Sequence, residues 1–299
     1  MYPGVDVVIL AYNSGSLLSR TLPKILKTDY PKMNFIVIDN GSVDGTTDFI
    51  NHSKFKKRVK LIKLDKNYGC AGGLNRSLPY LTSKYVAFLN EDIIPDKNWL
   101  KSSIKILESD KKIAAVMCKL VKPNTNEVEA ASTVFDEITC APNVSKTPRK
   151  ETPYVGLGNT IFRTKLVKRI PIEEKYFLYY EDVDYSFRIK SLGYKIIANQ
   201  ESILYHFHQG SVRRNFTKAQ VWRMNVRNRL LLFFRFYPIH KIILFYPFVL
   251  GRIILGGIKH TLKDGLECSL ATLLGIIDSF DIEWILTKRK ENRDKIWIY

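Results

Sequence analysis

The first 92 residues of the chain alternate between short apolar runs and segments with helical spacing. Runs rich in β-branched residues predict four strands, at Val5–Leu10, Phe35–Ile38, Val59–Leu64 and Tyr85–Leu89. Between these runs, apolar residues recur three or four positions apart, as on the buried face of a helix. Strands separated by helices in this way form βαβ units with right-handed crossovers. We therefore predict an α/β domain with a Rossmann-like, mostly parallel sheet and helices on both faces.

Beyond residue 95 the pattern is less regular. It predicts a helix at Asn98–Glu108, a strand at Ala114–Leu120, and then a polar surface loop that extends to about Pro153. A second ordered stretch, Tyr154–His208, contains short strands and an acidic run. After Thr217, a residue type that often caps helices, the pattern is helical to the end of the chain. The boundary is placed at residue 216: an α/β domain at 1–216, with halves at about 1–95 and 96–216, and a helical region at 217–299.

Each of the four predicted strands is followed by small, polar or acidic residues. These stretches are Ala11-Tyr12-Asn13-Ser14, Asp39-Asn40-Gly41-Ser42, Asn67 to Asn75, and Asn90-Glu91-Asp92. The carboxyl ends of parallel strands lie at one edge of a sheet, where open α/β sheets bind their ligands. A single stretch of this kind is also what a plain turn contains, but four at one edge are hard to explain by turn chemistry alone. The pattern therefore predicts a ligand site at this edge.

Individual residues at this edge suit a nucleotide. Asp39 ends a buried strand with an acceptor for a ring N–H of a base, and the Tyr12 ring offers a face for stacking. The glycines after the third strand let a bulky group approach the backbone: Gly69, Gly72 and Gly73. For the last two, tight packing of a helix against a strand is an equally good explanation. Neither a G-x-G-x-x-G nor a G-x-x-x-x-G-K-[ST] motif is present, which argues against dinucleotide and P-loop sites.

Three further residues point to a metal site. Asp92 is placed to join a divalent cation to a diphosphate, although a turn or helix cap is its alternative role. His206 and His208 alternate with aromatic residues, so in a strand both imidazoles share one face. A lone histidine is more often structural than a ligand, and two on one face favour a metal.

An acidic run lies upstream of the histidines. Glu181, Asp182 and Asp184 place three carboxylates within four positions, so mutual repulsion raises the pKa of at least one and makes it a better base near neutral pH. For Asp184 we expect an ion pair with Arg188, four residues further along a helix. Asp182 is then the candidate general base.

In this order, the motifs resemble those of the family 2 glycosyltransferases. The resemblance rests on Val7–Asn13, Val37–Thr46, Asn67–Asn75, Phe88–Asp92 and Phe177–Asp184. It covers about residues 5–236, including Arg227-Asn228-Arg229, and within the family it is strongest to the rhamnosyltransferase-like branch. The resemblance implies a GT-A fold, a nucleoside-diphosphate-sugar donor, a divalent metal (Mn²⁺ or Mg²⁺) and inversion at the anomeric carbon.

The resemblance also implies a role for each matching residue. Tyr12 and Asp39 match the positions that contact the base, and the residues expected along the nucleotide are Asn13, Asn67, Gly69, Gly72, Gly73 and Asn75. The stretch Asn90-Glu91-Asp92 occupies the D-x-D position beside the donor. Because asparagine replaces the first aspartate, Asp92 is expected to be the main carboxylate on the metal.

The downstream residues complete the implied site. Asp182, next to Glu181, matches the catalytic base. His206 matches the histidine that completes the metal site, and its spacing to the following serine favours it over His208. Arg213 and Arg214 follow closely, and we expect them to clamp the donor diphosphate.

The charge of the chain points to an acidic partner. There are 47 Lys+Arg against 29 Asp+Glu in 299 residues, a net charge of +18, and no Asp or Glu between Ser202 and Lys263. Nucleic acid, an anionic membrane and a phosphorylated substrate all fit such a field. Aromatic and apolar residues interleave with the basic ones, including Leu230–Phe234, so we predict helices that lie on anionic lipid. The alternative is a helical subdomain with a solvated basic face.

Other features bear on location. The run Ile242–Ile258 is broken by Pro247 and Arg252, which argues against a clear membrane span and leaves open whether the run inserts into a membrane or lies on it. The four cysteines stand far apart, which favours a reducing compartment, and no secretory signal precedes the first strand. We therefore predict a peripheral protein on the cytoplasmic face of the cell membrane.

These observations predict an inverting, metal-dependent glycosyltransferase that moves a sugar to a lipid-linked or cell-surface glycan acceptor. Asp39 as an N–H acceptor favours a UDP or dTDP donor. A sugar nucleotidyltransferase of related fold is disfavoured, because no Gly-rich, Arg-containing loop follows the first strand. A nucleic-acid-binding protein is disfavoured further, because the basic stretch has no RNA-recognition signature. The donor sugar, the acceptor and the oligomeric state stay open.

Overall fold

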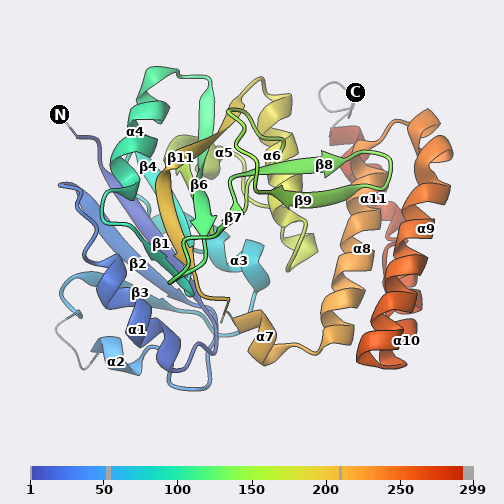
Figure 1. Cartoon of the computed structure of the whole chain (residues 1–299), viewed down its shortest axis with the longest axis horizontal. Coiled ribbons are helices and arrows are strands. Elements are labelled where there is room, and N and C mark those ends of the chain that lie inside the picture. The colour runs from blue at the N-terminus through green and yellow to red at the C-terminus, as the bar shows by residue number, and fades with distance from the viewer. Residues whose placement is uncertain (1, 52–54, 209–210, 292–299) are drawn as a thin grey trace.

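The computed structural model describes residues 2–51, 55–208 and 211–291, apart from the side chains of Ser211 and Arg213. A mixed sheet with helices on both faces forms the N-terminal part of the molecule. The helices of the C-terminal part lie together on one side of it (Figure 1).

Nine of the described strands form one sheet. Its first half is parallel and consists, from the edge inward, of β3 (Val59–Lys63), β2 (Met33–Asp39), β1 (Val5–Ala11) and β4 (Tyr85–Asn90). The second half is mixed and continues through β10 (Asn159–Arg163), β6 (Ile113–Val121), β11 (Lys195–His206) and β5 (Ile93–Pro95), with the short β7 (Val128–Ala130) paired to β6. The five strands that the sequence pattern places between residues 5 and 120 are all confirmed.

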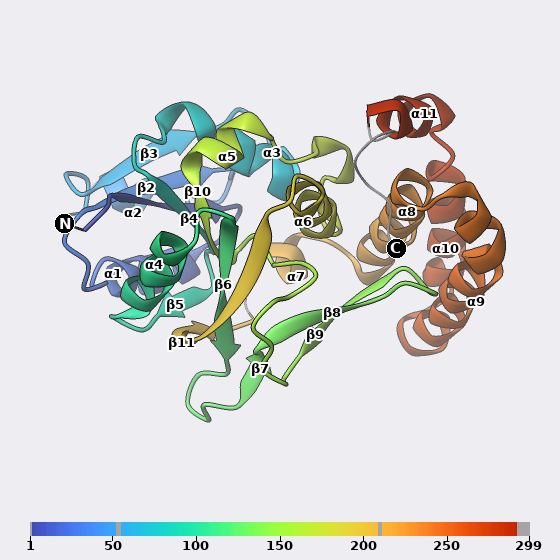
Figure 2. The same cartoon turned by 90° about the horizontal axis from the view of Figure 1, so that it is seen from above.

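Helices cover both faces of the sheet, as predicted (Figures 1 and 2). On one face, α1 (Ser16–Ile25) and α4 (Trp99–Ser109) pack against Val7 and Ile9 of β1. On the other, α3 (Gly69–Asn75), α5 (Thr164–Arg169) and α6 (Glu181–Ser191) pack around Val8. Burial on both sides explains why β1 is apolar at every position except Asp6, instead of alternating between apolar and polar residues. The remaining short elements of this part are α2 (Asp48–Asn51) and two single 3-10 turns, η1 (Leu78–Tyr80) and η2 (Glu174–Tyr176).

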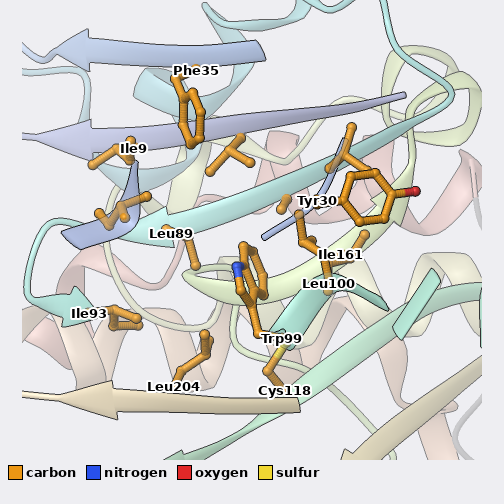
Figure 3. Close-up of a cluster of buried hydrophobic side chains, with 14 of the residues drawn as sticks. Ile9, Tyr30, Phe35, Leu89, Ile93, Trp99, Leu100, Cys118, Ile161 and Leu204 are labelled. Atoms are coloured by element: carbon orange, nitrogen blue, oxygen red, sulfur yellow. The ribbon is translucent and has the colours of Figure 1, made fainter. Parts of the chain in front are cut away.

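Trp99 anchors the first of these two cores (Figure 3). Its side chain is fully buried in the same cluster as Leu89, Ile161 and Leu204, which belong to three different strands. The indole N–H donates a hydrogen bond to the hydroxyl of Thr28 at 3.0 Å. Truncating a buried ring of this size costs about 3–5 kcal/mol. The core therefore fixes the strands whose ends form the candidate site.

The polar stretch predicted as a surface loop is partly an ordered hairpin, so that prediction is wrong in part. β8 (Ser132–Asp136) and β9 (Ala141–Ser145) pair in antiparallel fashion. In the turn, the Asp136 carboxylate accepts hydrogen bonds from the backbone N–H groups of Ile138 at 3.0 Å and Thr139 at 3.3 Å. These strands carry few apolar residues, so their sequence lacks the alternation that identifies a half-buried strand.

The C-terminal part is helical, as predicted. It contains α8 (Lys218–Phe236), α9 (Ile239–Asp264), α10 (Glu267–Asp278) and α11 (Ile282–Glu291), and the short α7 (Ser211–Asn215) precedes it. Thr217 caps α8: its hydroxyl accepts the Gln220 N–H at 3.2 Å, and the Gln220 side chain accepts the Thr217 N–H at 2.9 Å. This reciprocal pair is a capping box.

The prediction that Leu230–Phe234 lies on lipid is wrong. Leu230 and Phe233 are fully buried in a third core, which also contains Tyr180 and Val183 from the α/β part. Arg235 is buried as well, and its guanidinium contacts Asp184. The apolar core thus continues across residue 216, and α8 packs onto the α/β part with its basic residues bound to protein groups.

Candidate active site

A cavity of about 410 Å³ opens where β1 and β4 end. Most of the residues predicted for the site line it: Tyr12, Asn67, Gly69, Asn90, Glu91, Asp92, Glu181, Asp182, His206 and, in addition, His208. Several predicted residues lie outside the lining: Asn13, Asp39, Gly72, Gly73, Asn75 and Arg214. The side chain of Arg213 lies outside the described part of the chain. The sheet topology therefore brings together residues from five separate stretches, three of which lie at or beyond the ends of parallel strands.

The Glu91 carboxylate binds the loop that follows β1. One of its carboxylate oxygens, Oε2, accepts a hydrogen bond from the Tyr12 backbone N–H at 3.0 Å and another from the Ser14 hydroxyl. The other, Oε1, lies 3.2 Å from the Arg214 guanidinium, which also donates to the Ser14 carbonyl at 2.9 Å. Burial raises the pKa of Glu91 to about 7, although these bonds act to lower it. Glu91 and Arg214 thus position Tyr12 at the cavity.

Asp39 and Asn13 are bound within the neighbouring loops. The Asp39 carboxylate accepts the Ser42 backbone N–H and the Thr47 hydroxyl, each at 2.9 Å. Asn13 has a positive φ of 43°, and its side-chain oxygen accepts the Val43 N–H at 2.9 Å. Asp39 was predicted at the base and Asn13 along the nucleotide, but both shape the loops beside the cavity and neither lines it.

Asn40 also lines the cavity, and the sequence pattern predicted no role for it. Its amide donates to the side-chain oxygen of Asn67 at 2.9 Å and to the Gly69 carbonyl at 3.0 Å, and its oxygen accepts the Tyr68 N–H at 3.0 Å. Asn40 thereby holds the loop after β3 against the end of β2. Its place directly after Asp39, in the second polar stretch, was the signal available in the sequence.

The glycines after β3 allow neighbouring segments of the chain to pack closely. Gly69 has a φ of +72°, and a Cβ there would lie 2.2 Å from the carbonyl oxygen of Phe177. A Cβ on Gly73 would lie 2.5 Å from Leu10, and one on Gly72 would lie 2.8 Å from the Cβ of Tyr68. For Gly72 and Gly73 the structure thus supports a role in tight packing. From the sequence, this role and a role at the nucleotide were equally good explanations.

Asn75 lies away from the cavity. Its side-chain amide donates to the Ile172 carbonyl at 2.8 Å, and its oxygen accepts the Ile172 N–H at 3.0 Å. It also donates to Glu174 at 2.9 Å. These bonds tie the end of α3 to the segment before η2, so the structure does not bring Asn75 to the nucleotide position predicted for it.

Asp92, His206 and His208 meet at one side of the cavity, together with Glu129 of β7. His206 Nε2 is 3.4 Å from Asp92, and His206 Nδ1 is 3.3 Å from Glu129. His208 Nε2 is 2.6 Å from the other oxygen of Glu129, and the two imidazole centroids are 4.0 Å apart. Glu129 lies in the polar stretch that the sequence pattern assigned to a loop, and no motif pointed to it.

This cluster fits a divalent cation. Ligand atoms of Glu129, His206 and His208 all lie within 4.8 Å of one another, and Asp92 faces His206. Carboxylate oxygens are ligands for Mg²⁺ and Mn²⁺, and imidazole is the commonest nitrogen ligand for transition metals. Burial alone would lower the pKa of His206, but its bonds to Asp92 and Glu129 and their charges outweigh burial and raise it.

The acidic run begins α6 and also borders this cavity. Glu181 and Asp182 both line it, and burial raises the pKa of each. The charge of Asp182 raises the pKa of Glu181 further, so Asp182 ionises first. Among the described residues, no hydrogen-bond partner reaches the buried Oε2 of Glu181. Asp184 instead pairs with Arg188 at 2.7 Å, as predicted.

The backbone before α6 is strained. Phe177, Tyr179 and Tyr180 have φ values of 61°, 68° and 70°, which residues other than glycine rarely adopt. Asn228 of α8, fully buried, donates its side-chain amide to the carbonyls of Tyr176 at 2.9 Å and of Leu178 and Tyr179 at 2.8 Å. The helical region therefore holds the loop that presents Asp182.

Comparison with known proteins identifies the family of the chain. A family model described as glycosyl transferase family 2 matches residues 6–171. An uncharacterized glycosyltransferase of Haemophilus influenzae is 24% identical over 243 residues, which is 73% of each chain. The UDP-Glc:alpha-D-GlcNAc-diphosphoundecaprenol beta-1,3-glucosyltransferase WfaP of Escherichia coli is 24% identical over 225 residues, covering 74% of this chain and 84% of WfaP.

Solved structures show the fold. The crystal structure of GalNAc-T7 with UDP, GalNAc and Mn²⁺ superposes with a TM-score of 0.66 at 14% identity, covering 80% of this chain and 49% of that one. The sheet is thus of the GT-A type, as the resemblance implied. The rhamnosyltransferase-like branch stays a prediction. Because the family model spans more than half of the 299 residues, the chain belongs to glycosyl transferase family 2 and is a glycosyltransferase.

Proposed function

We propose that this glycosyltransferase is inverting and metal-assisted, and that it moves a sugar from a nucleoside-diphosphate sugar to a hydroxyl of a lipid-linked or cell-surface glycan. One observation carries the proposal: Asp182 lines the same cavity as Asp92 and His206. A single-displacement transfer needs a carboxylate base for the acceptor and positive charge for the leaving diphosphate. The side chain that would serve as the base and those that would hold the metal line this one cavity.

Asp182 would act as the base. It accepts the proton of the acceptor hydroxyl as that oxygen attacks the anomeric carbon from the face opposite the diphosphate. Burial raises the pKa of Asp182 above that of an ordinary aspartate, which strengthens it as a base while leaving it ionised near neutral pH. Glu181, whose pKa is raised further, stays protonated beside it and offers a neutral donor toward the cavity.

Asp92 and His206 would hold the metal, with Glu129 behind His206. A bound Mn²⁺ or Mg²⁺ supplies positive charge for the departing diphosphate. That GalNAc-T7, a protein of the same fold, was solved with UDP and Mn²⁺ supports this assignment. The residues themselves provide the orientation: Glu129 faces Nδ1 of His206 and leaves Nε2 directed at Asp92.

The donor and acceptor are proposed from the relatives. WfaP is named for transfer from UDP-Glc to α-D-GlcNAc-diphosphoundecaprenol, so we favour a uridine or thymidine diphosphate sugar and a lipid-linked acceptor here. Tyr12 lines the cavity and would stack on the base. A lipid-linked acceptor also suits a peripheral location on the cytoplasmic face of the membrane, which we retain as a proposal.

The test is a panel of nucleotide sugars with Mn²⁺ or Mg²⁺, scored for nucleoside diphosphate release with and without membrane extract. Asp182→Asn should abolish transfer and leave nucleotide binding largely intact. Asp110→Asn, in the turn between α4 and β6, is the matched control and should retain full turnover. Normal turnover in Asp182→Asn overturns the assignment of the base. Release of inorganic diphosphate would instead indicate the nucleotidyltransferase alternative.

A further inference from the structure

The outward side of α9 is apolar along its whole length. Exposed large apolar residues recur at helical spacing on this helix: Ile239, Ile243, Leu244, Phe248, Ile254, Leu255, Ile258 and Leu262. Leu255 is 69% and Leu262 84% exposed. A contiguous row of this size on one helix is unusual for a surface in contact with water only and marks a docking face.

The other side of α9 is already occupied by protein. Val249 and Ile253 are fully buried in the third core. A Cβ on Gly256 would lie 2.5 Å from the Trp222 ring of α8, and one on Gly257 would lie 2.5 Å from Thr272 of α10. The helix thus packs closely on its neighbours, and its exposed apolar face points away from them.

A row of basic residues borders this apolar face. Arg252, Lys259 and Lys263 are exposed and spaced by seven and four residues, so they lie within a narrow arc of the helix. Leu244, Leu255 and Leu262, spaced by eleven and seven, lie along the adjacent arc. An apolar row with a basic row at its edge is the pattern of a helix at the interface of an anionic bilayer.

The position of Arg252 decides how such a helix meets the membrane. By length and apolar content α9 is able to span a bilayer: its most apolar 18-residue window has a mean hydropathy of 1.7 and is 17% buried. Arg252, however, lies at the middle of Ile239–Asp264, so a spanning orientation would place a guanidinium at the centre of the bilayer. Lying flat keeps the whole basic row at the level of the lipid headgroups.

A second apolar row strengthens the flat orientation. On α10 and the residue before it, Leu266, Leu270, Leu273 and Ile277 are all more than half exposed and recur every three or four positions. The opposite side of α10 is buried: Cys268, Ala271 and Gly275 face inward, and a Cβ on Gly275 would lie 2.8 Å from Val226 of α8. Because α10 has twelve residues, it is too short to cross a bilayer and can bury this row only at the interface.

We infer that α9 and α10 lie flat on an anionic lipid surface, with their leucine and isoleucine rows in the outer acyl region and Arg252, Lys259 and Lys263 among the headgroups. The inference deepens the peripheral location proposed above and rests on it. It assigns the membrane contact to α9 and α10, whereas α8 belongs to the protein core.

The first experiment measures binding of the full chain to vesicles of phosphatidylcholine alone or mixed with phosphatidylglycerol, by co-sedimentation without substrate. The expected result is binding to the anionic vesicles only, weakened by salt. The double variant Lys259→Gln and Lys263→Gln should bind roughly thirtyfold more weakly, because each basic residue at an anionic surface contributes about 1 kcal/mol, a factor of about five. The matched control, Lys111→Gln with Lys112→Gln in the exposed turn before β6, loses the same charge and should bind normally.

The apolar row is tested by Leu244→Gln, Leu255→Gln and Leu262→Gln together, which should abolish vesicle binding without lowering the melting temperature. The depth of insertion is measured with two separate variants, Leu255→Trp and Leu262→Trp. Lipids brominated at different positions along the acyl chain quench the added tryptophan fluorescence, and the fluorescence of the parent protein is subtracted. A flat helix gives the same shallow depth at both positions. A deep Leu255→Trp beside a shallow Leu262→Trp means a spanning helix and overturns the inference.

Two further outcomes would also overturn it. One is equal binding to neutral and anionic vesicles. The other is a protein that does not bind vesicles and forms a dimer, which the three Leu→Gln changes dissociate. The apolar face would then be an interface between two copies of the chain. Nucleoside diphosphate release is assayed on the same preparations without lipid, so a failure of the proposed function is distinguished from a failure of membrane binding.

Discussion

Arg235 and Asp184 form a buried ion pair, with 2.6 Å between Nη1 and Oδ2. Arg235 belongs to α8 and Asp184 to the first turn of α6, two residues after Asp182. Asp184 is fully buried and is also contacted by Arg188 and by the hydroxyl of Tyr176. The pair therefore connects the helical region directly to the helix that carries the proposed base.

Replacing Arg235 should destabilise the protein strongly. Arg235→Met leaves the buried Asp184 with Arg188 as its remaining cationic partner, and removing one partner of a buried ion pair costs about 3–5 kcal/mol. Urea denaturation measures the free energy of unfolding. The double variant Asp184→Asn with Arg235→Met removes both charges and should recover part of the loss. If Arg235→Met unfolds with less than about 1 kcal/mol of destabilisation, the pair does not connect the two parts as argued.

Asn228 should matter for catalysis through the loop before Asp182. Asn228→Ala removes the donor shared by three carbonyls, so the strained backbone at Phe177, Tyr179 and Tyr180 relaxes and Asp182 moves. We expect kcat to fall by about a hundredfold, while the KM for the nucleotide sugar stays nearly unchanged.

The control is Asn225→Ala on the same helix, whose side-chain amide donates to the Val221 carbonyl at 2.9 Å. It should leave kcat unchanged. An equal loss of kcat in both variants would mean that damage to α8, and not the position of the loop, is responsible.

Gly69→Ala should impair donor binding. The new Cβ would meet the Phe177 carbonyl oxygen at 2.2 Å, and the backbone has a positive φ, so the loop after β3 must separate from the loop before α6. We expect the KM for the donor to rise by about tenfold or more, since a displacement of 1 Å at a binding site has effects of this size.

Gly193→Ala is the control for Gly69→Ala, because it introduces backbone strain without a steric clash. Gly193 has a φ of +78°, but apart from its chain neighbours no atom of the described residues lies within 4 Å of the position of its Cβ. This variant should lose about 1 kcal/mol of stability and keep its KM. A normal KM in Gly69→Ala would show that the contact with Phe177 does not shape the donor site.

The pH dependence of kcat/KM should report Asp182. The base works only when ionised, and burial raises its pKa above the ordinary value of 3.8. Activity is therefore lost as the pH falls through this raised pKa, and the acidic limb should have its midpoint clearly above pH 4.

Glu181→Gln should leave that limb in place, because Glu181 has the higher pKa of the two and is already neutral where Asp182 titrates. A limb that moves to low pH in Glu181→Gln would assign the titration to Glu181 instead.

Glu129 should support the metal site through His206. Removing a carboxylate behind a metal-binding histidine typically weakens metal binding by about 10–100-fold, so we expect this for Glu129→Gln. The readout is Mn²⁺ binding followed by electron paramagnetic resonance, without substrate. Asp92→Asn should weaken binding further. Glu127→Gln, two residues away and paired with Lys122 and Lys146 on the surface, is the control and should bind Mn²⁺ normally.

The sequence by itself determined the parallel half of the sheet and the edge at which the site lies. Both depend on local pattern: apolar runs such as Val5–Leu10 form strands wherever they are buried, and the end of each strand follows from where its run stops. The pairing of Asp184 with Arg188 was equally predictable, because residues four apart on a helix are neighbours whatever surrounds them.

Only the tertiary structure decided which residues far apart in the chain meet. Glu129 reaches His206 because β7 pairs with β6, and Asn228 reaches the loop before Asp182 because α8 packs onto α6. The side of each C-terminal helix that is covered was likewise undetermined by its sequence. A basic, aromatic helix such as α8 suits a lipid surface as well as a protein core, and the carboxylates that neutralise Arg235 lie about fifty or more residues earlier in the chain.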